Sequence, residues 1–347
     1  MLDLVSLKEF GYNFLGPILS SFTSNVYRQL KKQPKSTVYH LAREGYALKK
    51  AFDIHTESKN YDSHYLYASR TFLFRITLDL KESWELSVNH SFEGTLKDFF
   101  IARYAFSSEE VDEILKDVEG VSKVKLPADN KIIFEILEQK KALISSLVEN
   151  SRKCYLQYLD KINFTGKETL PVVLDIGYSG TIQKLLALLA NKHVEGIYMV
   201  TTRSGGGRIG NATYQISHCF KTSVKMGSGY ILLDRSMFLE SLLTAPDGQF
   251  VDILPGVEQD KFNFCFGKRN HNQENFYKLD YLLSGALQCI SDMQINNVEF
   301  STEEIEKLFE MYVTHRNLLP RASWPLFILD DAISGQGDLN PLDFFGL

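Results

Sequence analysis

Two spacings of hydrophobic residues alternate along this chain, one typical of amphipathic helices and one typical of buried strands. Apolar residues recur every three or four positions near the start, which predicts helix over residues 1–33. Gly16 and Pro17 interrupt that pattern and predict a break or a kink, because proline cannot continue the helical hydrogen-bond ladder. Short runs rich in β-branched and aromatic residues predict buried strands at residues 37–42, 64–68, 170–174 and 194–202.

The order of these elements predicts a parallel sheet. A tight loop at residues 43–45 and a helix at residues 46–55 separate the first two strands, and the apolar helical run IQKLLALLA separates the last two. A strand, a helix and a second strand in this order are typical of a βαβ unit, in which the two strands run parallel. We therefore expect an α/β fold built on a parallel sheet.

The remaining segments predict how the chain is divided. Residues 71–165 are rich in Glu, Lys and Leu at helical spacing, which predicts a helical insertion. The α/β core would then be discontinuous, formed by residues 1–70 and 166–255, with a mostly helical C-terminal region over residues 256–347. The glycine-rich stretch 203–210 lacks the Lys-Ser/Thr pair of a P-loop, so we expect a mobile loop there.

Composition narrows the classes of function. Hydrophobic residues make up 44% and charged residues 23% of the chain, as in ordinary globular proteins. The net charge of −5 argues against nucleic acid as a partner, because no basic excess is present to displace counterions. Four scattered cysteines fit free thiols in a reducing compartment, and no apolar run approaches the roughly 20 residues that span a bilayer. We expect a cytoplasmic protein without a transmembrane segment, with any membrane contact peripheral at the inner membrane.

The segment from Asp175 to Thr181 combines the features of an anion-binding loop. Asp175 ends a buried strand, and ligands of open α/β sheets bind at that edge. Gly177 and Gly180 let the backbone turn and approach an anion closely, while Ser179 and Thr181 add hydroxyl donors. A helix that begins near Thr181 points its free amides at the loop. The pattern predicts a phosphate site, and the ordinary alternative is a capped helix after a plain βα turn.

Basic residues follow the two earlier strands at the same predicted edge. Arg43 offers a bidentate phosphate donor beside the flexible Gly45, and Lys49 lies one helical turn further on. Ser69 and Arg70 follow the second strand. A surface salt bridge explains either arginine alone, but two arginines at successive strand ends favour a shared phosphate ligand.

Three motifs, LAREGY from residue 41, YLYASR from residue 65 and DIGYSGTIQ from residue 175, together resemble a known family. They are similar to the ligand loops of type I phosphoribosyltransferases. More closely, they resemble bacterial phosphoribosyltransferase-like glycosyltransferases that install ribofuranose in capsules and O-antigens. The resemblance implies a type I phosphoribosyltransferase-like core. It also implies donor contacts from Arg43, Glu44, Gly45, Tyr46, Lys49, Ser69, Arg70, Gly177, Tyr178, Ser179, Gly180 and Thr181.

The resemblance further implies a reaction and its partners. Phosphoribosyl pyrophosphate (PRPP), bound with Mg²⁺, would pass its 5-phosphoribosyl group to a hydroxyl of a glycan acceptor, either free or lipid-linked, and release pyrophosphate. A partner or fused phosphatase would afterwards remove the 5-phosphate. Asp175 would hold the ribose hydroxyls or a Mg²⁺-bound water. Ile176 replaces the second acid of the family pattern, which argues against an ordinary nucleotide-salvage enzyme.

Other roles rest on position along the chain. Glu240 and Asp234 are candidates for the base that activates the acceptor, with solvated helix charge as the ordinary alternative. Arg203 follows the last core strand and would help bind pyrophosphate or acceptor. The insertion 71–165 would be an acceptor-binding lid. Its aromatic residues are candidates for an acceptor groove, with core packing as the default, and are Trp84, Phe92, Phe99 and Phe100.

Two other functions stay open at this level. A phosphatase of the haloacid dehalogenase type would use Asp175 as nucleophile, but it needs a second acid where Gly177 stands. A non-catalytic sensor of a phosphorylated metabolite on the same fold would bind the donor without turnover. Turnover with a glycan acceptor separates the transferase from both.

Overall fold

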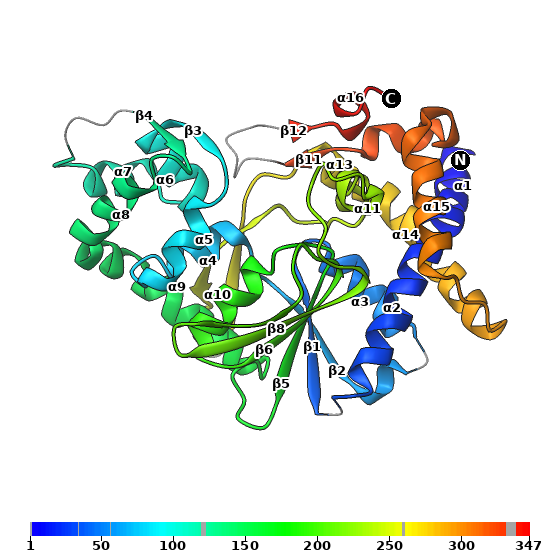
Figure 1. Ribbon diagram of the computed structural model, residues 1–347, viewed down its shortest axis with the longest axis horizontal. Helices are drawn as coiled ribbons and strands as arrows, with labels where there is room; N and C mark the ends of the chain where they lie inside the picture. Colours follow the sequence, from blue (N-terminus) through cyan, green and yellow to red (C-terminus); the bar gives the residue numbers. More distant parts are fainter. Residues whose placement is uncertain (1, 34, 56, 119–122, 259–260, 331–337) are drawn as a thin grey trace.

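A six-stranded sheet forms the centre of the computed structural model, which describes residues 2–33, 35–55, 57–118, 123–258, 261–330 and 338–347 (Figure 1). The strand order is β2-β1-β5-β6-β8-β7. The first five of these strands run parallel, and β7 pairs antiparallel with β8 at the edge. Their bounds are β1 Ser36–Leu41, β2 Asp62–Leu66, β5 Leu170–Asp175, β6 Val194–Val200, β7 Gly205–Ile209 and β8 Ala212–Lys221.

The path of the chain through the sheet creates a switch point between β1 and β5. From β1 the chain moves outward to β2, then returns across β1 to β5 and continues in the opposite direction to β6. Loops that leave the carboxyl ends of β1 and β5 therefore diverge to opposite faces of the sheet. In open α/β sheets, ligands bind in the crevice that such divergent loops leave.

The structure confirms the α/β class and the mostly parallel sheet, and it corrects two details. The glycine-rich stretch predicted as a mobile loop contains strand β7 over residues 205–209. An edge strand can form there because backbone groups, not side chains, make the ladder with β8. Strand β8 was not predicted, because its sequence ATYQISHCFK mixes polar and apolar residues as half-exposed strands do.

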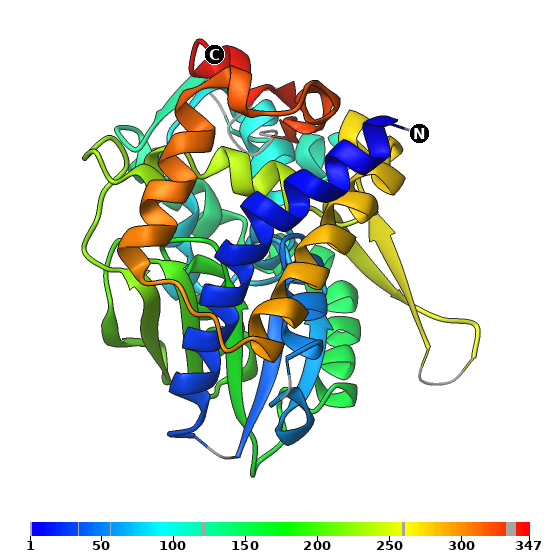
Figure 2. The ribbon, with the colours of Figure 1, turned by 90° about the vertical axis from the view of Figure 1, so that its right-hand side faces the viewer.

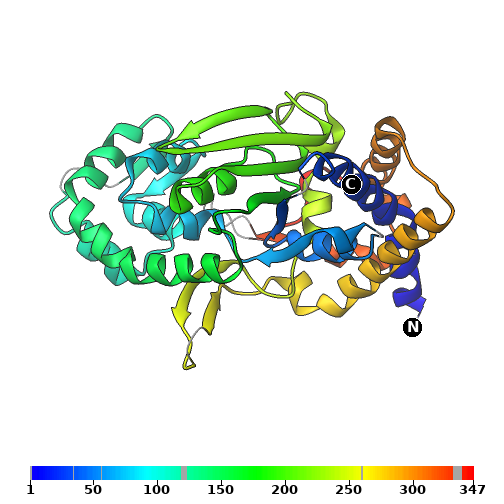
Figure 3. The same cartoon turned by 90° about the horizontal axis from the view of Figure 1, so that it is seen from below.

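Helices cover both faces of the sheet, and the alternation of side chains along β1 and β5 explains how (Figure 3). Val38 and Val172 face the core that contains α2 (Gly16–Leu30) and α3 (Gly45–Asp53). Their neighbours Tyr39 and Val173 face the second core, which contains α4 (Arg70–Ile76), α9 (Lys141–Lys161) and α10 (Thr181–Ala190). Because successive strand residues point to opposite faces, these strands are buried on both sides.

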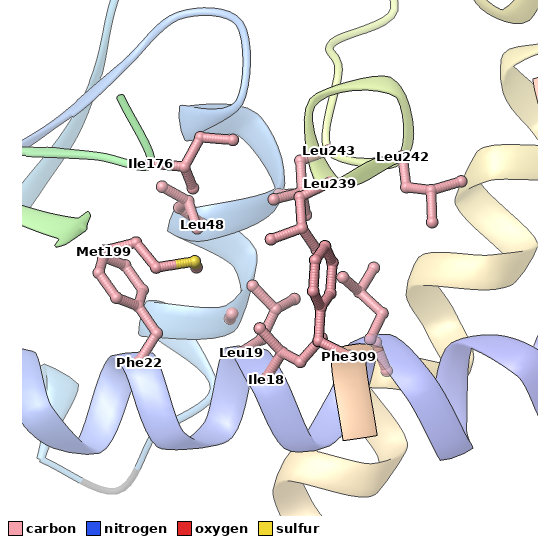
Figure 4. Packing of buried hydrophobic residues seen from close by; sticks show 14 of the residues in the cluster. Ile18, Leu19, Phe22, Leu48, Ile176, Met199, Leu239, Leu242, Leu243 and Phe309 are labelled. Carbon is pink, nitrogen blue, oxygen red and sulfur yellow. The ribbon is translucent and has the colours of Figure 1, made fainter. Parts of the chain in front are cut away.

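The first core also fixes a short helix beyond the sheet, α12 (Met237–Leu242). Leu239 and Leu243 of this segment pack near Leu48 of α3 and Phe309 of α15 (Thr302–Thr314) (Figure 4). Ile176, which directly follows β5, belongs to the same cluster. This packing brings α12 to the carboxyl end of the sheet, close to the loop predicted to bind phosphate.

The predicted insertion is mainly helical and includes one small sheet. It lies to one side of the central sheet in Figure 1. Its elements are α4, η3 (Lys81–Ser83), α5 (Trp84–Val88), β3 (Phe92–Thr95), α6 (Leu96–Tyr104), α7 (Ser108–Ile114), β4 (Lys123–Leu126), α8 (Asn130–Gln139) and α9. β3 and β4 pair antiparallel, a feature that the helical prediction missed. Trp84, Phe92, Phe99 and Phe100 are buried in its core and do not line a groove.

The two ends of the chain lie apart from each other, both on the side of the molecule away from the insertion (Figure 1 and Figure 2). α1 (Leu2–Phe10) continues through a π-helical turn (Gly11–Leu15) into α2, so the predicted break at Gly16 is a change of helical winding. The other elements are η2 (Ser58–Asn60), α11 (Ile231–Asp234), β9 (Phe250–Pro255), β10 (Phe262–Phe266), α13 (His271–Glu274), α14 (Phe276–Ile295), η4 (Arg316–Leu318), η5 (Arg321–Leu326), β11 (Leu329–Asp330), β12 (Asp338–Leu339) and α16 (Pro341–Phe344). Among the described residues, no helix has the length and apolar character to cross a membrane.

Candidate functional site

Three carboxyl groups converge at the switch point between β1 and β5. Glu44 follows β1, Asp175 ends β5, and Glu240 lies on α12. β1 and β5 are hydrogen-bonded neighbours, and the charges of both glutamates act on Asp175. The peptide bond between Ala42 and Arg43, in the loop after β1, is cis. The structure therefore brings two of the predicted motifs, LAREGY and DIGYSGTIQ, to one place.

The pKa of Asp175 lies close to neutral pH. Burial raises the pKa of Asp175 to about 7, and the nearby charges of Glu44 and Glu240 contribute to the rise. The amides of Gly177 and Ile176 oppose it by hydrogen bonding to the ionised form. Strongly shifted carboxyls of this kind are common at sites that bind or move protons.

The loop after β5 presents an open helix terminus. The first helical residue of α10 is Thr181, as the sequence predicts, and the residue before it, Gly180, adopts a φ of 66° that favours glycine. Since Gly180 has no side chain, no side chain caps this helix within the described structure. The hydroxyls of Ser179 and Thr181 lie 2.9 Å apart beside the free amides. This arrangement suits an anion at the helix N-terminus.

Two cations flank this loop. The ammonium group of Lys184 donates to the carbonyl oxygen of Ser179 at 2.9 Å. Burial lowers the pKa of Lys184, and the charge of Arg203 lowers it further, so the two cations lie near one another. The amide of Thr202 donates to the carbonyl of Tyr178 at 3.0 Å and ties the end of β6 to the loop. Arg203 thus lies beside the loop, whereas its predicted role was in binding pyrophosphate or acceptor; Lys184 was not predicted at all.

The predicted arginines lack protein partners. Within the described parts of the chain, the guanidinium groups of Arg43, Arg70 and Arg203 form no ion pair and no hydrogen bond. The surface salt bridges that would explain them without a ligand are therefore not formed there. Burial lowers the pKa of His90 and of Arg103, both in the insertion, and the charge of Arg70 lowers each further. Arg70 therefore lies near these two residues. The structure does not join Arg70 to Arg43.

Glu240 is held at the site by a tyrosine from the phosphate loop. The hydroxyl of Tyr178 donates to Oε1 of Glu240 at 2.6 Å. Burial raises the pKa of Tyr178 well above its usual range, and the charge of Glu240 raises it further, so Tyr178 stays protonated and keeps donating. Glu240 is only partly buried, and within the described residues its second oxygen accepts no hydrogen bond.

Asp234, the other candidate base, has a different role in the structure. Its two carboxylate oxygens accept hydrogen bonds from the amides of Gly227 at 2.6 Å and Gly229 at 2.7 Å. These bonds close the loop before α11. Because both oxygens are engaged by backbone groups, Asp234 organises a turn, and the structure does not bring it into contact with Glu240 or Asp175.

Three other predicted contacts have structural partners instead. Lys49 donates to Asp53 at 2.6 Å and to Ser63 at 3.0 Å, away from the loop after β1. The hydroxyl of Ser69 donates to the carbonyl of Phe250 at 2.6 Å. It also accepts a hydrogen bond from the backbone amide of Phe72 and so caps the N-terminus of α4. Tyr46 packs edge-on against Tyr65, with ring centroids 6.3 Å apart.

A cavity of about 460 Å³ lies elsewhere, between the π-helical turn, α14 and α15. Its lining is mostly apolar, and its charged side chains are Asp292 and Glu304. The hydroxyl of Tyr12 donates to Asp292 at 3.0 Å. A lining with two carboxylates and no cation does not suit a phosphorylated ligand, so the carboxyl edge of the sheet is the candidate site.

Comparisons with known proteins add no relative. No family model and no curated protein matches this chain. The function must therefore be argued from the geometry of the site.

The carboxylates at the switch point are of the chemical type that contacts a phosphate-bound Mg²⁺ ion. No group of three or more metal-binding side chains is present among the described residues. Mg²⁺ usually keeps several waters and is bound by one or two carboxylates together with substrate phosphates. Asp175 and Glu44 are the carboxylates that would serve this role, and the charge of Glu44 contributes to the raised pKa of Asp175.

Gly45 determines how closely α3 approaches β1. A methyl group at this position would lie 2.5 Å from the carbonyl carbon of His40 and 2.7 Å from its oxygen. We expect Gly45→Ala to lower the free energy of unfolding by about 1–3 kcal/mol, measured by urea denaturation, because the backbone must move to make room. Gly267→Ala is the control, since an added methyl there meets nothing closer than 3.6 Å. Equal effects of the two changes would contradict this interpretation.

Proposed function

We propose that this chain is a PRPP-dependent phosphoribosyltransferase. It transfers the 5-phosphoribosyl group to a hydroxyl of a glycan acceptor and releases pyrophosphate, on a type I phosphoribosyltransferase-like core. The main support is the meeting, at the β1–β5 switch point, of an open anion loop, an unpaired arginine and a carboxyl with a pKa of about 7. A phosphate, a pyrophosphate and ribose hydroxyls are the three parts of this donor, and each has a matching group.

The donor would lie along the carboxyl edge of the sheet. The 5-phosphate would accept hydrogen bonds from the first amides of α10 and the hydroxyls of Ser179 and Thr181, with Lys184 and Arg203 balancing its charge. The ribose hydroxyls would donate to Asp175. The pyrophosphate would lie against Arg43, whose planar group binds two phosphate oxygens at once.

In the transfer step, the bond between the anomeric carbon and the pyrophosphate oxygen breaks with its electron pair remaining on pyrophosphate. The acceptor oxygen forms a bond to the same carbon and gives its proton to Glu240. Tyr178 orients Glu240 through their 2.6 Å hydrogen bond. Positive charge develops on the ribose ring, where the carboxylates oppose it, and negative charge develops on pyrophosphate, where Arg43 meets it. Bound Mg²⁺ would add positive charge on the pyrophosphate side.

The pKa of Asp175 predicts how donor binding depends on pH. The ribose hydroxyls donate to the ionised carboxylate, so binding favours loss of the proton. With a pKa of about 7 in the free protein, PRPP affinity should be constant well above pH 7. It should weaken as the pH falls below 7, approaching about tenfold per pH unit. Calorimetric titrations between pH 6 and pH 8.5 measure this.

Inorganic pyrophosphate with Mg²⁺ is the control ligand, because it has titrating phosphates but no ribose hydroxyls. Its affinity should fall less steeply than that of PRPP as the pH decreases through 7. Parallel curves for the two ligands would contradict the assignment of Asp175 to the ribose.

A turnover assay tests the proposed reaction. The chain is incubated with PRPP, Mg²⁺ and a panel of oligosaccharides, pyrophosphate release is followed, and products are examined by mass spectrometry. The proposal expects pyrophosphate in equal amount to an oligosaccharide that carries one phosphoribosyl group. Release of inorganic phosphate from ribose 5-phosphate would instead indicate a sugar phosphatase. Donor binding without any product would indicate a sensor.

A further inference from the structure

Aromatic residues line the side of the Arg43–Glu44 loop that faces away from the phosphate loop. Tyr65 lies in β2 and Tyr67 just after it, with ring centroids 5.1 Å apart. Because Leu66 between them is buried, these two rings project on the same side of the strand end. Both residues are partly exposed, and the ring of Tyr67 packs against the rings of Phe264 and Phe266, with centroids 4.4 Å and 5.5 Å away. The two tyrosines lie next to the predicted donor site without belonging to it.

The hydroxyls of these two tyrosines are free to bind a ligand. Among the described residues, neither hydroxyl has a hydrogen-bond partner. This differs from Tyr155 and Tyr158 of α9, whose hydroxyls bond to the backbone of Tyr67 at 2.9 Å and 3.2 Å. Those two hydrogen bonds hold the backbone of Tyr67 in place, so the positions of the free hydroxyls are well defined.

The segment that contains Asp247 runs beside Tyr67, because the ring of Phe250, three residues after Asp247, lies 6.1 Å from the ring of Tyr67. Burial is the main cause of the raised pKa of Tyr65 and of Tyr67, and the charge of Asp247 raises both further. The charges of Glu44 and Arg43 also act on Tyr65, which connects this surface to the switch point. Asp247 pairs with Arg269 at 2.9 Å.

The backbone around Asp247 is held firmly. The buried amide of Gln273 donates to the carbonyl oxygens of Ala245, at 3.0 Å, and Asp247. A methyl group at Gly248 would lie 2.2 Å from the carbonyl oxygen of Gly267, so the two backbones pack directly against each other. A carboxylate on such a support keeps its position when a ligand arrives.

We propose that Tyr65, Tyr67, Asp247 and Arg269 form the acceptor subsite and that it takes an uncharged sugar. This inference rests on the proposed transferase function, because it places the acceptor across the Arg43–Glu44 loop from the phosphate loop. The two tyrosine hydroxyls, the carboxylate of Asp247 and the guanidinium of Arg269 offer donors and acceptors for sugar hydroxyls. Asp247 pairs with Arg269, so within the subsite no net charge selects an ionic sugar.

The test is the binding of fluorescently labelled protein to an array of bacterial surface oligosaccharides, neutral and acidic, in the absence of PRPP. We compare wild type with Tyr65→Phe/Tyr67→Phe, which removes only the two free hydroxyls, and with Asp247→Asn. The control is Tyr281→Phe, an exposed tyrosine of α14. We expect wild type and the control to bind neutral glycans, and each subsite variant to bind them at least about tenfold more weakly, the loss expected for one or two hydrogen bonds.

Three results would overturn the subsite. They are wild-type protein that binds no glycan, variants that bind as well as wild type, and binding confined to acidic glycans. A separate calorimetric titration of wild type with PRPP distinguishes the failure of this inference from failure of the proposed function. If PRPP does not bind but neutral glycans bind through these residues, the donor assignment fails while the sugar-binding surface stands.

Discussion

Replacing Glu240 by Gln should reduce turnover by at least about a hundredfold while leaving PRPP binding close to that of wild type. General bases contribute about 10²–10⁴-fold to proton-transfer steps, and an amide cannot accept the acceptor's proton. Gln keeps the size of the side chain and its hydrogen bond from Tyr178. The measurement is steady-state pyrophosphate release with an acceptor identified in the array experiment, together with calorimetric PRPP titration.

The chain offers a matched control for this change. The hydroxyl of Tyr230 donates to Glu306 at 2.8 Å, the same type of contact in a part of the structure between α11 and α15. Glu306→Gln should leave turnover unchanged. Tyr178→Phe should give an intermediate loss, because Glu240 remains but is no longer oriented. Normal turnover in Glu240→Gln would remove Glu240 from the role of base.

Replacing Asp175 by Asn should abolish measurable PRPP binding, with an expected loss of at least about a hundredfold. Hydrogen bonds to a charged group contribute about 1.5–3 kcal/mol each, and two of them to the ribose hydroxyls correspond to a loss of that size or more. Calorimetric titration at pH 8 measures the loss, because Asp175 of the wild type is then mostly ionised.

The stability of this variant separates a lost ligand contact from a lost fold. The pKa of Asp175 is raised to about 7 in the folded chain, above the value of about 3.9 in an unfolded one. The folded state therefore holds the proton more tightly, and stability falls as the pH rises from about 4 to 7. At pH 8, a neutral Asn should leave the melting temperature equal or higher. A lower melting temperature together with lost binding would point to misfolding.

The sequence predicts the central βα unit well because every local signal agrees there. Val172 and Val173 are buried, Asp175 ends the strand, and Gly180 makes the turn before α10. The same holds for the first βαβ unit. Strands β7 and β8 escaped prediction because they lie towards the sheet edge, where glycines and polar residues are tolerated and the hydrophobic pattern is weak.

The site itself was only partly predictable, for reasons of distance along the chain. The contact between Tyr178 and Glu240 joins residues 62 positions apart, and no periodic pattern reports it. The position of Lys184 could have been predicted from the sequence. It lies one helical turn after Gly180, so its side chain is on the side of α10 that contacts the loop. Lys49 contacts Asp53, four residues later, which is the partner that helical spacing favours. The contacts of Asp234 with Gly227 and Gly229 could not be predicted, because these glycines lie in an irregular loop.

The account depends most directly on whether PRPP binds at the β1–β5 switch point. Isothermal titration calorimetry of the full chain with PRPP and Mg²⁺ at pH 8, run beside ribose 5-phosphate and beside Asp175→Asn, measures this. The account predicts saturable binding of PRPP, weaker binding of ribose 5-phosphate because the pyrophosphate contact with Arg43 is missing, and no PRPP binding by the variant. Absence of PRPP binding to folded wild-type protein, or equal binding by Asp175→Asn, would contradict it.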